Sequence, residues 1–186
     1  MVYLHGRCGD ATNGCPHFEP GVAGFGWLVC PPATQRCADG GVSWSGSTAQ
    51  KRAVVDAAIG AVAASFPGLV DVAAPSVVIG FSQGAYVAVD MVRERPGRYM
   101  GMLLIGAEIT ATAEALSAAG VKRVVLAAGV YDGDAVAAVG HDVGEAHRRA
   151  WRGGARHGLA GDRDRAARST RNSRSRRATT SPSSVR

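Results

Sequence analysis

The order of apolar segments along the chain is the feature that most restricts what it can fold into. Short, continuous runs rich in Val, Ile and Leu alternate with segments of helical period. We expect strands over residues 2–4, 27–30, 76–81, 100–106 and 122–128, and helices over residues 47–66, 84–95 and 112–119. Apolar strands alternating with helices are typical of a parallel sheet that is covered on both faces. The sequence therefore predicts an α/β fold with about five parallel strands flanked by helices.

The charged residues divide the chain near residue 140. Residues 1–140 carry 9 Lys and Arg against 11 Asp and Glu, whereas residues 141–186 carry 12 Arg against 4 acidic residues. Large apolar residues almost disappear after Trp151, so the second part cannot bury enough surface to offset its ordering entropy. We predict a folded domain over residues 1–140 and a disordered Arg/Ser-rich tail over residues 141–186.

A G-x-S-x-G motif, Gly80-Phe81-Ser82-Gln83-Gly84, joins the third predicted strand to the second predicted helix. This strand–turn–helix setting is the one that a nucleophile elbow requires, with the serine hydroxyl exposed at the end of the sheet. Glycines suit the motif because the turn is strained and larger neighbours would clash. Ser82 is therefore the candidate nucleophile, and the alternative is an ordinary turn in which Ser82 caps the helix.

The segment His5-Gly6-Arg7-Cys8 follows the first predicted strand and is the candidate oxyanion loop. A tetrahedral acyl intermediate carries an oxyanion that backbone N–H groups can stabilise. One expected donor is the N–H of Gln83, in the first turn of a helix whose dipole favours negative charge there. The other expected donor is the N–H of Arg7, with that of Cys8 as the alternative. We expect His5 to brace the loop rather than to take part in catalysis.

A carboxylate after the last predicted strand is suited to orient a histidine by accepting its Nδ1–H. Asp132, in Gly129-Val130-Tyr131-Asp132, is the preferred acid. Asp134 is the alternative two residues on, and Glu108, after the fourth predicted strand, is a weaker one.

The three segments together, over roughly residues 1–133, resemble the α/β-hydrolase superfamily in order and spacing. The Gly-Phe-Ser-Gln-Gly string is similar to that of its phospholipase/carboxylesterase and acyl-protein thioesterase branch. The resemblance implies a Ser–His–Asp triad and hydrolysis of a small-molecule carboxylic ester or thioester through an acyl-enzyme on Ser82. It implies no cofactor.

Against this family the chain lacks the usual first and last strands, so the resemblance implies a truncated α/β-hydrolase fold. In the family a helix and a strand separate the acid from the histidine, whereas here Gly140-His141 follows Asp132 by nine residues. His147 and His157 come later. We name His141 as the base because it belongs to a Gly-His pair and has the shortest connection to Asp132. A catalytically impaired remnant of the fold is the alternative to an active hydrolase.

Four cysteines are arranged as two C-x6-C pairs, Cys8 with Cys15 and Cys30 with Cys37. Zinc-binding cysteines are usually two to four residues apart, so a metal site is not expected. We expect either two local disulfides within these pairs or four reduced thiols. Disulfides would indicate an oxidising compartment. No signal peptide precedes the first apolar segment, which favours a cytoplasmic protein, or a secreted one if the N-terminus is incomplete.

The composition also bears on whether the chain contacts a membrane or nucleic acid. No apolar run is long enough to span a bilayer, so no membrane span is expected. The tail contains Arg168, Arg171, Arg174, Arg176 and Arg177, a pattern that can contact nucleic-acid phosphates weakly. It lacks interleaved aromatic residues for base stacking, so a solvated tail is the preferred interpretation. The sequence does not indicate an oligomeric state.

Overall fold

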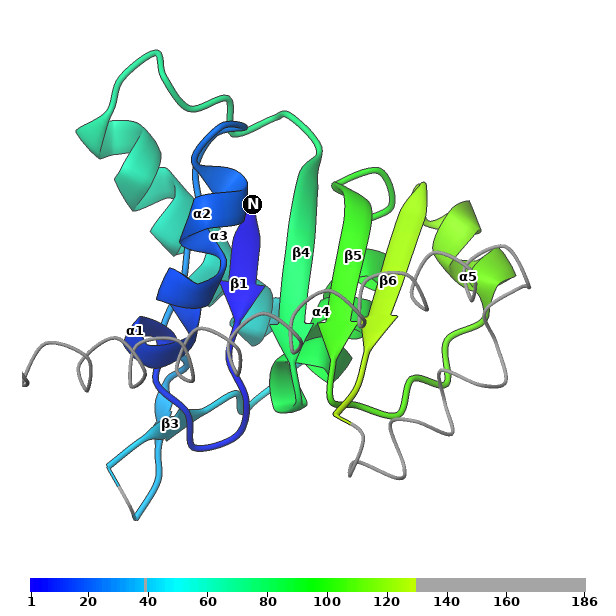
Figure 1. The fold of residues 1–186 in the computed structure, drawn as a ribbon. Helices are drawn as coiled ribbons and strands as arrows, with labels where there is room; N and C mark the ends of the chain where they lie inside the picture. Colours follow the sequence, from blue (N-terminus) through cyan, green and yellow to red (C-terminus); the bar gives the residue numbers. More distant parts are fainter. Residues whose placement is uncertain (39, 130–186) are drawn as a thin grey trace, which may run out of the picture. The chain divides into compact units, whose positions relative to one another are not determined.

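A computed structural model describes residues 1–38 and 40–129 of the chain (Figure 1). The predicted tail, and the end of the predicted domain, lie outside the described residues. The centre of the fold is a four-stranded sheet in the order β1-β4-β5-β6, and all its neighbouring strands are parallel. Its strands are β1 (Val2–Leu4), β4 (Ser76–Phe81), β5 (Tyr99–Ile105) and β6 (Arg123–Ala127). The predicted α/β arrangement with a parallel sheet is confirmed.

The strand expected over residues 27–30 is wrong as a member of this sheet. Only Val29 bridges to β1, where the Tyr3 N–H donates to its carbonyl at 2.9 Å and its own N–H donates to the Met1 carbonyl at 2.9 Å. The next parallel ladder bond on this side would need an N–H at residue 31, and Pro31 has none. The pairing therefore ends after one residue, and the sheet has four strands.

The three predicted helices are all present, each with its ends moved by about one residue. They are α3 (Thr48–Ser65), α4 (Gln83–Glu94) and α5 (Ala113–Ala118). Ser47 begins α3 with a capping box, in which its hydroxyl accepts from the Gln50 N–H and the Gln50 side chain accepts from the Ser47 N–H. Helix α4 packs closely on β4 and against α3, and seven of its residues are buried. It holds the sheet on the side that lies behind β4 and β5 in Figure 1.

Several short elements before α3 are not predicted by the sequence pattern. They are α1 (Ala11–Gly14), the 3-10 turn η1 (Cys15–His17), α2 (Glu19–Val22), β2 (Gln35–Arg36) and β3 (Val42–Ser43). Helices α1 and α2 lie to the left of β1 in Figure 1, and the rings of Tyr3 and Phe18 are 5.1 Å apart. Strands β2 and β3 form an antiparallel hairpin of their own. Each of these elements has four residues or fewer, too few to show a periodic apolar pattern.

The cysteines are all paired in disulfides, but the expected local pairing is wrong. The bonds join Cys8 to Cys37 and Cys15 to Cys30, with Cα–Cα distances of 5.7 and 6.1 Å. Helix α1 separates Cys8 from Cys15, while the β2–β3 hairpin brings Cys37 back beside the loop that follows β1. The path of the chain therefore brings each cysteine next to one that is 15 or 29 residues away in sequence.

No helix within the described part of the chain is both long and apolar enough to cross a membrane.

Candidate active site

Ser82 lies at the carboxyl end of β4, immediately before α4, in a backbone conformation that non-glycine residues rarely adopt. Its φ and ψ are 51° and −117°. The Ser82 N–H donates to the Ile105 carbonyl at 2.8 Å, which ties the turn to the end of β5. Although Ser82 is the N-cap residue, its side chain makes no capping hydrogen bond. The alternative in which Ser82 acts as a helix cap is therefore not what the structure contains.

Glycines surround Ser82 where neighbouring backbone approaches too closely for a side chain. A Cβ on Gly80 would come within 2.5 Å of the Ala85 Cα, because the first turn of α4 lies directly over the end of β4. A Cβ on Gly84 would overlap the Leu4 carbonyl oxygen and lie 2.8 Å from that of His5. A Cβ on Gly6 would lie 3.3 Å from the Ser82 Cβ. The loop after β1 therefore lies against the serine.

The loop after β1 is held by His5, which is buried with 1% of its surface exposed. The Ala33 N–H donates to His5 Nε2 at 3.1 Å, so Nε2 is the acceptor nitrogen and Nδ1 carries the proton. Nδ1 lies 2.8 Å from the Gly6 carbonyl oxygen, which also accepts the Gly9 N–H at 3.1 Å. His5 thus braces the loop, as the sequence predicts.

These two hydrogen bonds also orient the next peptide group. The peptide between Gly6 and Arg7 is trans, so its N–H and its carbonyl point in opposite directions. Because the Gly6 carbonyl is directed at His5 and Gly9, the Arg7 N–H points away from both of them. The alternative donor, the Cys8 N–H, is instead engaged by the Ser43 Oγ at 2.9 Å. The N–H of Gln83, in the first turn of α4, has no acceptor within its own helix.

A cleft of about 460 Å³ opens beside Gly6 and Phe81, the neighbour of Ser82. Its apolar lining consists of Tyr3, Phe18, Phe81 and Ile105, and its polar lining includes Arg7, Asp10, Asn13 and His17. Burial raises the pKa of the Tyr3 phenol above its usual value. Hydrogen bonds from the Thr12 N–H and hydroxyl, each 2.8 Å long, lower the pKa of the Asp10 carboxyl. Three of the four apolar side chains that line it are aromatic, so we refer to it as the aromatic cleft, although Arg7 and Asp10 also line it.

Most of the other predicted site residues lie beyond residue 129. Asp132, Asp134 and all three later histidines, His141, His147 and His157, lie outside the described residues, as does the Arg-rich run of the tail. Glu108 is described and is exposed in the segment after β5.

The sequence did not predict that Ser43 and Trp44 contact the loop after β1. Trp44 is buried in the core, and its indole N–H donates to the His5 carbonyl at 3.0 Å. The Gln83 side chain accepts the Trp44 N–H and donates to the Trp44 carbonyl, each at 3.0 Å. The one sequence signal for this arrangement is Gly40-Gly41, a pair typical of a hairpin turn, just before Val42.

Among residues 1–38 and 40–129, no group of three or more His, Cys, Asp or Glu side chains could hold a metal ion.

Comparison with known proteins links this chain to none of them. No family model matches it, and searches of curated proteins and of solved structures found no significant relative.

Proposed function

We propose that the protein is a serine hydrolase of the α/β-hydrolase type that cleaves carboxylic esters or thioesters through an acyl-enzyme on Ser82. The observation that carries the proposal is the backbone of Ser82, at a φ of 51° between a buried strand and a helix. A strained turn of this kind is tolerated where it presents a side chain for chemistry, and the hydroxyl is not used to cap α4. The sheet is parallel, and Ser82 and the loop after β1 both lie at the carboxyl ends of its strands, where functional residues of such sheets are usually found; this supports the same proposal.

In the proposed reaction the Ser82 Oγ attacks the carbonyl carbon of the ester or thioester. The N–H groups of Arg7 and Gln83 stabilise the negative charge that develops on the carbonyl oxygen. Collapse of this intermediate breaks the bond to the leaving group, which departs as an alcohol or thiol after taking the serine proton. Water then hydrolyses the acyl-enzyme and restores the Ser82 hydroxyl.

The aromatic cleft supports binding of one apolar part of the substrate next to the reacting carbonyl. Phe81 and Gly6 line the cleft, and both are adjacent to Ser82, one in sequence and one in space. Proton transfer requires a base, for which His141 oriented by Asp132 is our proposal. An impaired hydrolase, with the serine and the oxyanion donors but no base, is the alternative.

A fluorophosphonate probe tests the proposal without a guess about the substrate. The parent protein is expected to be labelled on Ser82 and to hydrolyse short-chain nitrophenyl esters. Ser82→Ala should abolish labelling and lower turnover on the order of 10³-fold or more, because the nucleophile is lost.

Ser117→Ala is the matched control, because Ser117 is exposed on α5 and the same hydroxyl is removed away from the elbow. It should leave labelling and turnover unchanged. Equal turnover by the parent and Ser82→Ala would refute the proposal, whereas a folded parent that neither labels nor turns over would favour the impaired hydrolase.

A further inference from the structure

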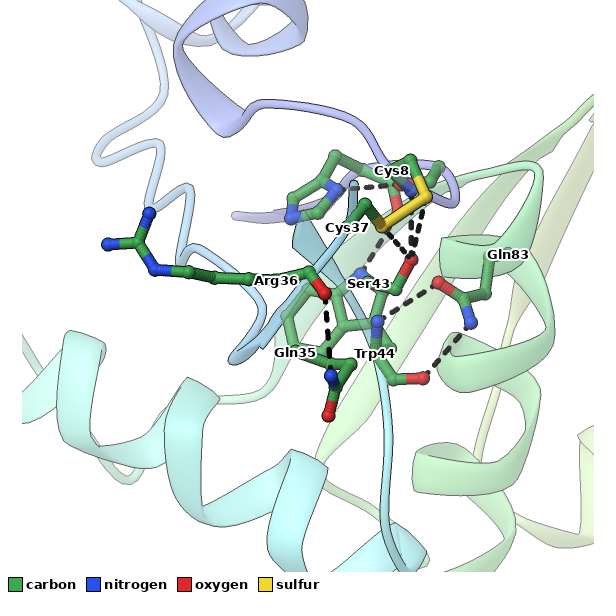
Figure 2. The surroundings of a disulfide bond; sticks show 9 residues. Cys8, Gln35, Arg36, Cys37, Ser43, Trp44 and Gln83 are labelled. Atoms are coloured by element: carbon green, nitrogen blue, oxygen red, sulfur yellow. Dashed lines mark hydrogen bonds between the residues drawn. A yellow bond between two sulfur atoms is a disulfide. The ribbon is translucent and has the colours of Figure 1, made fainter. Parts of the chain in front are cut away.

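Ser43, the last residue of the β2–β3 hairpin, and Trp44, directly after it, contact the two parts of the candidate oxyanion hole. These parts are the loop that contains Arg7 and the start of α4 at Gln83. Ser43 is buried, and its hydroxyl accepts the Cys8 N–H at 2.9 Å. The same hydroxyl lies 3.2 Å from Cys37 Sγ and 3.5 Å from Cys8 Sγ. Disulfide sulfurs carry no hydrogen, so the hydroxyl is the donor in those contacts. Ser43 is therefore bonded to the residue that follows Arg7 (Figure 2).

Trp44, the next residue, contacts the start of α4. The Gln83 amide makes two 3.0 Å hydrogen bonds to the Trp44 backbone, one as acceptor and one as donor (Figure 2). Gln83 is also the residue whose own N–H begins α4. Through its indole, Trp44 is bonded to the His5 carbonyl as well. One short segment thus connects the start of α4 to the loop after β1.

The Cys8–Cys37 disulfide fastens this hairpin to the loop. The bond joins residues 29 apart in sequence. The Val42 N–H donates to the Gly9 carbonyl at 3.0 Å, and the Cys37 N–H donates to the Gly41 carbonyl at 2.8 Å. Cys8 itself has a φ of 52°, an unusual conformation for a cysteine that the disulfide and Ser43 hold in place.

The second disulfide has no such connections. Cys15 and Cys30 join the turn η1 to the segment after Val29, and both line a different cleft. Residues 13–14 and 17–18, on either side of Cys15, line the cleft beside Gly6 and Phe81, so loss of this bond should act on KM rather than on kcat. The chain therefore contains its own control for the effect of a lost crosslink on kcat.

We propose that the β2–β3 hairpin, fastened by Cys8–Cys37, is a positioning element that sets the separation and orientation of the Arg7 and Gln83 N–H groups. The inference rests on the proposed hydrolase function. Stabilisation of an oxyanion depends on donors that are in place before charge develops, and misplacement by about 1 Å can cost about 100-fold in rate. No described residue of the hairpin lines the aromatic cleft, so loosening the hairpin should lower kcat by much more than it changes KM.

The test compares the two disulfides in the full-length chain by nitrophenyl ester hydrolysis. Cys8→Ala/Cys37→Ala should lower kcat by about 10- to 100-fold with KM changed by less than about twofold. Cys15→Ala/Cys30→Ala should keep kcat within about twofold of the parent, although it also loses a crosslink. Ser43→Ala, which keeps both disulfides, should also lower kcat. Ser45→Ala is its control, because Ser45 is exposed two residues further on, and it should leave kcat unchanged.

The outcomes separate the inference from the function on which it rests. Equal kcat losses in both disulfide variants, or full kcat in Cys8→Ala/Cys37→Ala and Ser43→Ala, overturn the positioning role while Ser82-dependent turnover of the parent stands. If Cys8→Ala/Cys37→Ala does not fold, Ser43→Ala decides by the same kcat and KM criterion. A parent without Ser82-dependent labelling or turnover overturns the proposed function, and the inference falls with it.

Discussion

At the scale of single residues, the glycines near Ser82 are explained by backbone that passes too close for a side chain. Gly84 is the clearest case, because the atoms that a Cβ would meet are the carbonyl oxygens of Leu4 and His5. These belong to the end of β1 and the start of the oxyanion loop, and neither can move without disturbing the sheet. Gly60, in contrast, is exposed in the middle of α3, where a Cβ would have nothing within 4 Å outside its own helical turn.

Alanine substitution of these two glycines should therefore have opposite effects on stability. Gly84→Ala should lower the free energy of unfolding by about 2–3 kcal/mol, since overpacking against fixed backbone forces the helix from the sheet. Gly60→Ala should raise it by about 1 kcal/mol, because alanine loses less conformational entropy in a helix. Urea unfolding followed by circular dichroism measures both, and a stable Gly84→Ala would contradict the close contact between α4 and β1.

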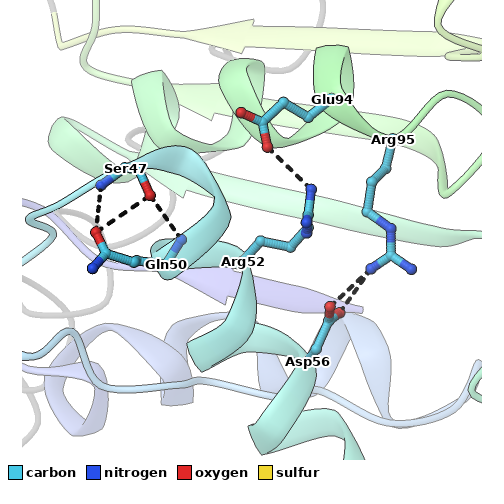
Figure 3. A network of polar contacts seen from close by, with 6 residues as sticks. All are labelled: Ser47, Gln50, Arg52, Asp56, Glu94 and Arg95. Carbon is cyan, nitrogen blue, oxygen red and sulfur yellow. Dashed lines mark hydrogen bonds and ion pairs between the residues drawn. The ribbon is translucent and has the colours of Figure 1, made fainter.

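At the scale of elements, α3 and α4 are joined by polar contacts as well as by their apolar faces (Figure 3). Arg95 makes two hydrogen bonds to the Asp56 carboxylate, at 2.8 and 3.1 Å, and Arg52 lies 3.0 Å from the Glu94 carboxylate. The side chains of these pairs are between 29% and 42% exposed, so each ion pair is worth less than about 1 kcal/mol. The capping box at Ser47 satisfies donors that the helix cannot satisfy itself, and its contribution is less sensitive to salt.

Loss of the Ser47 cap should therefore lower the free energy of unfolding measurably. Ser47→Ala should lower the free energy of unfolding by about 1 kcal/mol, because the Gln50 N–H loses its acceptor. Ser65→Ala, at the other end of α3, is the control, since the Ser65 hydroxyl donates only to a helix carbonyl, that of Ala61. It should change stability by less than about 0.5 kcal/mol. Equal effects of the two substitutions in thermal unfolding would argue against a capping role for Ser47.

At the scale of the whole molecule, two disulfides close loops within the first 37 residues, where the regular elements are shortest. Cys8–Cys37 spans 29 residues and Cys15–Cys30 spans 15. A crosslink stabilises a fold mainly by restricting the unfolded chain, and the gain grows slowly with loop length. The two bonds should therefore contribute similarly to stability even though only one of them contacts the candidate site.

Removal of either disulfide by paired alanine substitution should lower the free energy of unfolding by about 3 kcal/mol. Guanidinium unfolding of the two double variants beside the parent measures this loss. A loss below about 1 kcal/mol for both would mean that the short elements before α3 are stable without crosslinks. The comparison also supplies the stability baseline for the activity test of the hairpin.

Most of the central sheet, and the turn that carries Ser82, follow from local features of the sequence. The strand over residues 76–81, the helices around residues 47–66 and 84–95, and the position of Ser82 between strand and helix could be predicted, because apolar continuity, helical period and a contiguous motif are local properties. The strand predicted over residues 27–30 was wrong as a member of the sheet, because Pro31 lacks the N–H that its next ladder bond would need.

The pairing of the cysteines and the residues that hold the loop after β1 could be learned only from the folded chain. Cys8 meets Cys37 rather than Cys15, and Ser43 and Trp44 bond to Cys8 and Gln83 across 35 and 39 residues. Hydrogen bonds between a side chain and a distant backbone group leave no periodic trace in the sequence, because they depend on where separate loops end in space. The candidate nucleophile could therefore be found from a motif, whereas the hairpin that we propose positions the oxyanion donors became visible only in the folded chain.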